Sequence, residues 1–258
     1  MSQGFDTRIV SYEHIHSISP DDFKKLIDAI DPKANEVILD AMCGYGAVGK
    51  AILEQEPRAN LFLLDESSVQ VDRAIQNISN LDKGHFITSS LPHDNFSDNF
   101  FDKIVIKMGL HEVSLAQHLQ ILKEFNRILK LTGKIIVWDI MLNDNTQSLF
   151  QDIIREKDRL AGYDLLTTER YFFRENEFLK NTEEAGFTKV TEFHKISYRF
   201  SSKRRLESEL KNDISKLKEL NEFIRIRFPQ NLKQLMNYEE KGDDIQFTIT
   251  KKIYVLQK

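Results

Sequence analysis

From residue 36 onward, short apolar runs alternate with segments in which apolar residues recur at helical spacing. The runs lie at 37–39, 61–64, 104–106 and 134–138, and each is bounded by polar residues. Such runs are typical of strands buried on both faces of a sheet. Because helical patterns separate them, the chain is predicted to be an α/β protein: a parallel sheet with helices on both faces.

Several helix boundaries can be predicted from single residues. Ser19 followed by Pro20 and two acids is typical of a helix start, and Ser114 with Gln117 matches a capping box. Further along, apolar periodicity predicts helices over 147–166 and 175–185, and one continuous charged helix over 203–228. Strands are predicted near 190–200 and at the end of the chain, where the alternating apolar residues are Ile245, Phe247, Ile249, Ile253 and Val255.

The amino-acid composition limits the class of protein to which the chain can belong. The 258 residues have a net charge of −4, with 41% hydrophobic and 29% charged residues, which is ordinary for a globular chain. No basic excess indicates nucleic acid, and no apolar run is long enough to span a bilayer. One cysteine suits a reducing compartment, and the N-terminus has no secretory pattern. We therefore expect a cytoplasmic protein with no nucleic-acid or membrane partner.

The segment from Glu36 to Gly49 holds the most specific pattern: a strand, an acid, a glycine-rich turn and a helix start. Gly44 and Gly46 allow a sharp turn and a close approach of a ligand to the backbone. The next apolar run ends in Asp65, nineteen residues after Gly46. A carboxylate at that place suits a ribose diol, and the helix start offers unpaired N–H groups. The pattern predicts a site for an adenosine-containing cofactor.

The same loop also matches the dinucleotide fingerprint G-x-G-x-x-G from Gly44 to Gly49. In dinucleotide folds, however, the first glycine follows the strand almost at once. Here four residues that begin with Asp40 intervene, and this acid would repel a pyrophosphate but suits an ammonium or sulfonium group. A nicotinamide-dependent oxidoreductase is thus a weaker alternative.

The D-x-x-x-G-x-G pattern with the later acid resembles the class I S-adenosylmethionine-dependent methyltransferases, in particular the group that includes ubiquinone and menaquinone C-methyltransferases. The resemblance continues through Leu91-Pro92 and residues 100–106 to the turn at 128–137, and so covers about 35–140. It implies S-adenosylmethionine as cofactor and S-adenosylhomocysteine as product. Departures are Met42, where a glycine is common, and Thr132, where a proline is usual. A third is that no acid precedes Leu91-Pro92 to bind the adenine amine, so Ser89 or Ser90 would have to serve there. The implied cofactor-binding residues are Asp40, Met42, Gly44, Gly46, Asp65, Glu66, Ser89, Ser90, Leu91 and Met108.

The resemblance also implies the architecture. We expect a doubly wound, mostly parallel sheet of seven strands, in which the last strand is antiparallel, with helical cap insertions. Residues 1–34 would form a helical segment over the cofactor site, and 35–140 the cofactor-binding core. Residues 141–258 would complete the core and carry a cap or lid at about 145–170 and 203–240.

Catalytic residues are harder to predict, because methyl transfer needs positioning more than covalent help. His111 follows the fourth strand, at the sheet edge where ligands bind. It is a candidate base or substrate contact, and the alternative is a histidine that fixes its loop through Glu112. His14 and His16 are further candidates, although nothing in their spacing requires a metal and we predict none. Tyr12 and Tyr45 are candidate substrate contacts.

Other chemistry-bearing residues have ordinary structural explanations. Cys43 is best explained as a small side chain that fits the tight turn. Phe172, Phe173 and Phe178 either line a lid or pack in the core. The basic cluster at 203–205, with Arg225 and Arg227, could hold a phosphate or carboxylate, but interleaved glutamates favour a solvated face. The apolar stripe of the predicted 203–228 helix either forms the cap or pairs two chains, so a monomer and a homodimer both stay open.

The sequence thus predicts a methyltransferase that acts on a small molecule. The alternatives are a nucleic-acid methyltransferase, or a module that binds S-adenosylmethionine without turning it over. O-, N- and C-methylation all stay open.

Overall fold

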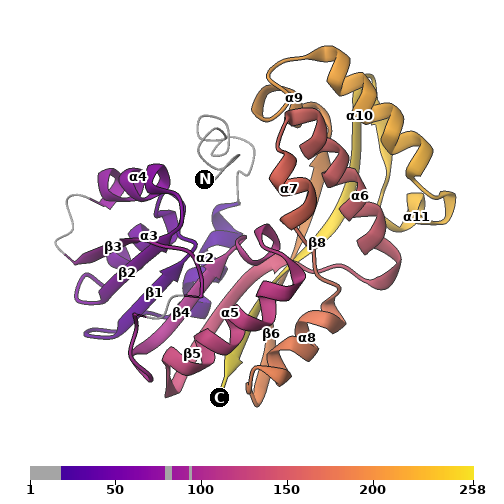
Figure 1. The fold of residues 1–258 in the computed structure, drawn as a ribbon. Helices are drawn as coiled ribbons and strands as arrows, with labels where there is room; N and C mark the ends of the chain where they lie inside the picture. The colour runs from indigo at the N-terminus through magenta and orange to yellow at the C-terminus, as the bar shows by residue number, and fades with distance from the viewer. Residues whose placement is uncertain (1–18, 79–82, 93–94) are drawn as a thin grey trace.

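The computed structural model describes residues 19–78, 83–92 and 95–258. Its centre is a single mixed sheet in the order β3-β2-β1-β4-β5-β8-β6, and β7 pairs with the free part of β8 (Figure 1). The first five of these strands are parallel, while β8 runs antiparallel to β5, β6 and β7. The expected architecture of a seven-stranded, mostly parallel sheet with an antiparallel last strand is confirmed, and the short β7 is an addition to it.

The elements of the core follow the alternation that the sequence predicts. Its strands are β1 (Val37–Ala41), β2 (Asn60–Asp65), β3 (Gly84–Thr88), β4 (Phe101–Lys107), β5 (Leu129–Ile140), β6 (Lys189–Ser201), β7 (Glu239–Lys241) and β8 (Asp244–Gln257). Its helices are α2 (Pro20–Ile30), α3 (Ala47–Gln55), α4 (Ser68–Ile78), the short η1 (Leu110–Glu112), α5 (Leu115–Ile128) and α8 (Glu175–Glu184).

Successive residues of the inner strands point to opposite faces, so the sheet has two apolar cores. On β1, Ile38 packs with α2, α3 and α4, whereas Leu39 and Ala41 pack with α5 and α8. The predicted helix starts are present: the Ser19 side chain accepts a hydrogen bond from the backbone N–H of Asp22, and Ser114 with Gln117 forms a capping box. The sheet is thereby covered on both sides, as a parallel sheet requires.

A second lobe stands on the ends of β6 and β8 that extend beyond the core sheet (Figure 1). Strand β8 pairs with β5 only from Lys251 onward, while its pairing with β6 continues to Gln246. The extended part carries a third apolar cluster that includes Phe200, Phe247 and residues of the cap helices. These helices are α6 (Asp144–Ala161), α7 (Asp164–Glu169), α9 (Lys203–Ser208), α10 (Ile214–Arg227) and α11 (Gln230–Leu235).

The continuous helix predicted over 203–228 is wrong. The chain forms α9 and α10 instead, because Lys211 and Asn212 adopt left-handed backbone angles with φ of 55° and 61°, and Asp213 then caps α10. The helix predicted over 147–166 is similarly divided into α6 and α7, with Gly162 in the left-handed region between them. The apolar stripe on 203–228 is largely internal, since Leu210, Leu217 and Ile224 are buried in the third cluster.

The N-terminal part of the chain is described only from residue 19. Helix α2 packs on the sheet face with Trp138 and Ile253, and its residues do not line the cavities described below. Within the described ranges, no helix combines the length and the apolar character that a membrane crossing needs.

At Gly49, helix α3 packs against side chains of β2 with no room for a Cβ, and this gives a first prediction. A Cβ there would lie 2.8 Å from Leu63 Cδ2 and 2.9 Å from Leu61 Cδ2. Gly49→Ala should therefore lower the free energy of unfolding by about 1–3 kcal/mol through overpacking. Urea denaturation measures this, with the exposed Glu54→Ala on the same helix as control. Equal stability of the two variants would show that α3 can move away from the sheet without cost.

Candidate functional site

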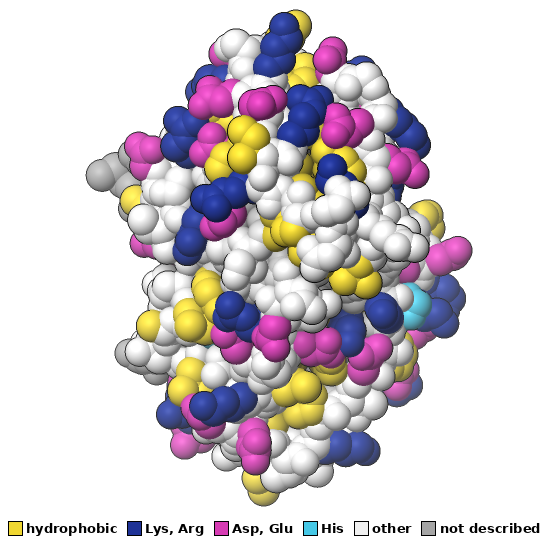
Figure 2. Space-filling view, turned by 90° about the vertical axis from the view of Figure 1, so that its right-hand side faces the viewer, with side chains coloured by type: hydrophobic (Ala, Val, Ile, Leu, Met, Phe, Trp, Pro, Cys, Tyr) yellow, Lys and Arg dark blue, Asp and Glu magenta, His cyan; other side chains and the backbone are white. Residues whose placement is uncertain are grey.

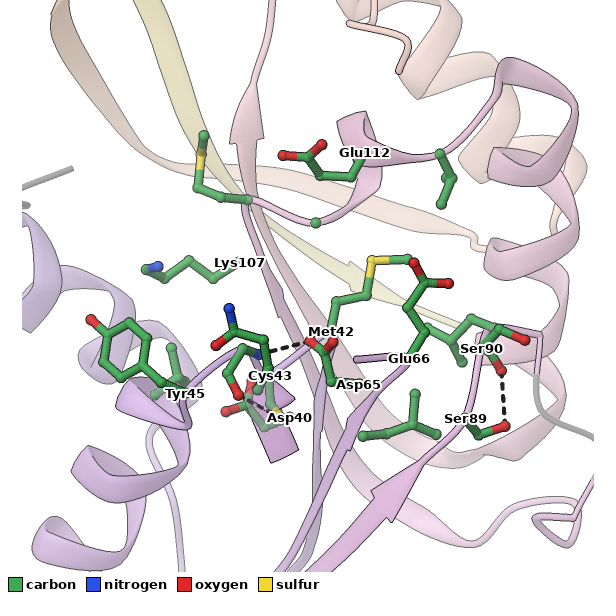
Figure 3. A pocket seen from close by; sticks show the side chains of 18 of the residues that line it. Asp40, Met42, Cys43, Tyr45, Asp65, Glu66, Ser89, Ser90, Lys107 and Glu112 are labelled. Carbon is green, nitrogen blue, oxygen red and sulfur yellow. Dashed lines mark hydrogen bonds between the residues drawn. The ribbon is translucent and has the colours of Figure 1, made fainter. Parts of the chain in front are cut away.

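A cavity with an empty volume of about 1160 Å³ lies at the carboxyl ends of β1, β2 and β4. In an open α/β sheet this edge is where ligands bind. Figure 3 shows Tyr45 and Lys107 on one side of it, Glu66, Ser89 and Ser90 on the other, and Glu112 above. Of the residues expected at the cofactor site, all but Gly46 line this cavity: Asp40, Met42, Gly44, Asp65, Glu66, Ser89, Ser90, Leu91 and Met108.

Two carboxylates hold the glycine loop that forms the floor of the cavity. Asp40, at the end of β1, accepts a hydrogen bond from Gly49 N at 2.9 Å and so ties the strand to the first turn of α3. Asp65, at the end of β2, accepts from Gly44 N at 2.8 Å and from Ser67 N at 3.0 Å (Figure 3). The loop is therefore fixed from both neighbouring strands.

The backbone of this loop explains the glycines and one departure from the family pattern. Gly44 and Gly46 have φ of 54° and 78°, in the left-handed region that glycine adopts without strain. Met42 has φ of 53°, so the position where a glycine is common does require a glycine-like conformation. Although Gly46 does not line the cavity, a Cβ there would lie 3.0 Å from Ala74 Cβ, so its absence lets α3 pack against α4.

Burial controls the charge of the groups around the loop. It raises the pKa of Asp40 to about 7, despite the opposing effects of the Gly49 hydrogen bond and of Lys107. It also raises the pKa of the Cys43 thiol well above its usual range, which agrees with a packing role for this cysteine. A cation bound near Asp40 would stabilise the ionised carboxylate.

Among the lining residues that were not predicted from the sequence, Lys107 and Gln70 have polar side chains that a ligand could use. Lys107 ends β4. Its side chain makes no hydrogen bond or ion pair with the described residues, and burial lowers its pKa. Gln70, on α4, has a buried Oε1 for which the described part of the chain provides no hydrogen-bond donor. Lys107 could have been predicted, because it is a polar residue directly after the apolar run of an inner strand. Nothing in the local sequence indicates that Gln70 faces a cavity.

His111 lies behind the cavity and is held between two carboxylates. Its Nδ1 is 2.5 Å from Asp139 Oδ1, its Nε2 is 3.4 Å from Glu112 Oε1, and its ring stacks on Phe172. Burial alone would lower the pKa of this imidazole, but the two carboxylates outweigh it and raise the pKa to about 9. At neutral pH His111 is thus an imidazolium, which is a poor proton acceptor; the alternative interpretation, in which it fixes its loop through Glu112, agrees better with this geometry.

The smaller cavity, with an empty volume of about 460 Å³, lies between the core and the cap. It shares Met108 and Glu112 with the larger one, and His111 and Phe172 also line it. Phe173 and Phe178, in contrast, are buried in the core. The basic cluster predicted at 203–205 is divided: Lys203 and Arg204 are exposed, as are Arg225 and Arg227, but Arg205 is buried at this cavity.

Three candidates fall outside the described residues: Tyr12, His14 and His16. Tyr45 lies at the larger cavity. Within 19–78, 83–92 and 95–258, no group of three or more His, Cys, Asp or Glu side chains is arranged to hold a metal ion.

Comparisons with known proteins agree on one family. The sequence model of a methyltransferase domain matches residues 38–133. A demethylmenaquinone methyltransferase of Thermotoga maritima is 25% identical over 118 residues, which cover 46% of this chain and 49% of that protein. A ribosomal RNA large subunit methyltransferase G of Colwellia psychrerythraea is 28% identical over 109 residues, which cover 40% and 28%. This chain thus spans at most half the length of these curated relatives.

A solved structure extends the likeness to the whole fold. A candidate methyltransferase from Bacillus halodurans superposes with a TM-score of 0.77 at 20% identity, covering 92% of this chain and 98% of that one. The likeness therefore includes the cap lobe as well as the matched core.

The His111 ion pairs predict a pH-dependent stability. Because the pKa of His111 is about 9 in the folded chain and about 6.5 in an unfolded one, its contribution is fully present below pH 6.5. It is lost as the pH rises through 9, and it amounts to about 3 kcal/mol. Urea unfolding of wild type and His111→Gln between pH 6.5 and 9.5 should show the two stabilities converging. The exposed His85→Gln is the control, and parallel curves for wild type and His111→Gln would contradict the ion pairing.

Proposed function

The chain carries a class I S-adenosylmethionine-dependent methyltransferase domain, and on this premise we propose that it transfers the methyl group of S-adenosylmethionine to a small-molecule acceptor. The observation that carries the proposal is the pair of carboxylates, Asp40 and Asp65, that end neighbouring parallel strands and hold one glycine loop at one cavity.

The residues present suit this cofactor. Asp65 and Glu66 offer carboxylate oxygens for a ribose diol at the end of β2. Asp40 lies where an ammonium or sulfonium group would offset its burial. The Oε1 of Gln70, which has no donor among described residues, can accept a hydrogen bond from a ligand in the cavity. Ser89, Ser90 and Leu91 provide the side on which we expect the adenine.

When bound, the cofactor supplies an electrophilic methyl group. The chain's part is to orient the acceptor towards it and to exclude water. Met108 and Glu112, which line both cavities, lie where an acceptor in the smaller cavity would face the cofactor in the larger one. If the acceptor must lose a proton, Lys107 is a suitable base because its pKa is lowered by burial, and Glu112 is a second candidate.

A small-molecule acceptor is favoured over a nucleic acid by charge and shape. The chain has a net charge of −4, and the face in Figure 2 shows acidic and basic side chains intermixed, with no basic tract. The smaller cavity lies between core and cap and has room for a small molecule. One relative acts on ribosomal RNA, however, so a nucleic-acid methyltransferase is the second candidate. We further propose a cytoplasmic location, because one cysteine suits a reducing compartment.

Product formation separates these candidates. Purified protein with S-adenosylmethionine is incubated with small-metabolite and RNA fractions, and S-adenosylhomocysteine release is measured. We expect release with a small-metabolite fraction alone. Release with RNA alone would favour the nucleic-acid enzyme. Binding of the cofactor without release on any fraction would favour a binding module.

Removal of the Asp65 carboxylate should weaken cofactor binding specifically. Asp65→Ala is expected to raise the dissociation constant for S-adenosylhomocysteine by about 10- to 100-fold, because hydrogen bonds to a charged acceptor contribute about 1.5–3 kcal/mol. Isothermal titration calorimetry measures this, the melting temperature checks the fold, and Asp72→Ala on the exposed side of α4 is the control. An unchanged constant for Asp65→Ala would reject the ribose assignment.

The raised pKa of Asp40 predicts that cofactor binding depends on pH. A bound ammonium group favours the ionised carboxylate, so affinity should increase from pH 6 to pH 8, through the pKa of about 7, and then level off. Binding near pH 7 should also release a proton, which is detected by titrations in buffers with different ionisation enthalpies. If Asp40→Asn kept the same pH dependence as wild type, another group would be responsible.

A further inference from the structure

The smaller cavity has an unusual wall, because buried ionisable side chains form much of it. Lys157, Arg170, Arg205 and Lys251 line it together with His111, and each of these side chains is at most 5% exposed. Buried charges are expensive unless they are paired. Each cation is therefore expected to have a counter-charge, either from a carboxylate of the protein or from a bound ligand.

Four of the five cations have carboxylate partners. Arg170 pairs with Glu112 at 2.5 Å and with Asp158 at 2.9 Å. Lys157 pairs with Asp158 at 2.7 Å and also with Glu209, which in turn accepts from Arg205.

His111 pairs with Asp139 and Glu112. The four acids Glu112, Asp139, Asp158 and Glu209 thus balance four cations, and Lys251 is the fifth.

The side chain of Lys251 makes no hydrogen bond and no ion pair with any residue in the described ranges, although the residue is only 4% exposed. Its Nζ lies 3.9 Å from the centre of the Tyr198 ring, which is a cation–π contact. Burial, with Lys107 and Arg205 nearby, lowers its pKa to about 7, and Asp139 and Asp22 only partly oppose this.

Arg205 supplies a second unused donor at the same cavity. Its guanidinium donates to the Tyr198 hydroxyl at 2.6 Å and to Glu209 at 3.2 Å. The Nε–H is buried and has no hydrogen-bond acceptor among described residues. Tyr198 therefore contacts both cations, with its ring beneath the ammonium of Lys251 and its hydroxyl on Arg205.

The position of Lys251 links this pair to the reaction site. It is the residue of β8 opposite Ile140, the last residue of β5, so it lies where β8 leaves the core sheet for the cap. The cavity it lines reaches Met108 and Glu112 at the border of the larger cavity. If one end of a small molecule is bound beside Lys251, the rest of that molecule can extend towards the cofactor site.

We propose that Lys251 and Arg205 form a subsite for an anionic group of the methyl acceptor, a carboxylate or a phosphate. The assignment rests on the proposed function, because it names the class of acceptor for that site. A bound anion provides the missing counter-charge for Lys251 and an acceptor for the Arg205 Nε–H. Lys251, whose side chain has no hydrogen bond or ion pair within the described residues to lose, is the residue by which the subsite can be tested.

The test uses three ring compounds of similar size: benzoate and phenyl phosphate as anions, and benzyl alcohol as the neutral control. Each is titrated calorimetrically into wild type and into Lys251→Met, with and without saturating S-adenosylhomocysteine. We expect wild type to bind at least one anion about tenfold or more tightly than benzyl alcohol, and Lys251→Met to lose that preference. Exposed Lys218→Met on α10 should behave as wild type.

The melting temperature of the ligand-free variants gives an independent readout. Since Lys251 is a buried charge without an ion pair, Lys251→Met should melt at the same temperature as wild type or higher. If the methionine variant does not fold, Lys251→Gln removes the charge while keeping a polar end.

Three results would overturn the subsite: no anion binds wild type, benzyl alcohol binds as tightly as the anions, or the variant keeps the preference. Anion binding without S-adenosylhomocysteine binding would instead retain the subsite and reject the proposed function.

Discussion

The structure depends most on the two hydrogen bonds by which neighbouring strands hold one loop. Asp40 fixes the first turn of α3 through Gly49 N, and Asp65 fixes the loop itself through Gly44 N. Both acids end parallel strands, so the same contacts that order the loop leave carboxylate oxygens at the edge of the sheet. Asp40 and Asp65 thus stabilise the loop and also line the cavity. For this reason one short sequence pattern indicates both the fold and the binding site.

The features that the sequence predicted well are those set by local chemistry. Ser114 caps α5 as its spacing with Gln117 predicts, and the acid–glycine pattern from Asp40 to Gly46 forms the predicted loop. What it did not predict depends on contacts between distant segments. The charge of Arg205 suggested a solvated face, yet its side chain on cap helix α9 is buried beside Glu209 and Tyr198. The break of the 203–228 helix depends on Asn212 in a left-handed conformation, which apolar periodicity does not register.

The long strands β6 and β8 connect the core, which carries the larger cavity, to the cap beside the smaller one. They complete the sheet that carries the cofactor cavity, and their extensions support the cap that forms one side of the smaller cavity. Lys251 lies at the junction, with four ion-paired cations around the same space. The family model matches residues 38–133 only, whereas the charged wall lies mostly on later segments of the chain, so acceptor choice is best sought there.

The most direct test of the central claim is a crystal structure of the protein grown with S-adenosylhomocysteine. We predict density in the cavity lined by the glycine loop, with the ribose hydroxyls on Asp65 and the amino-acid end beside Asp40. An empty cavity at saturating ligand, or a ligand bound away from both carboxylates, would contradict the account.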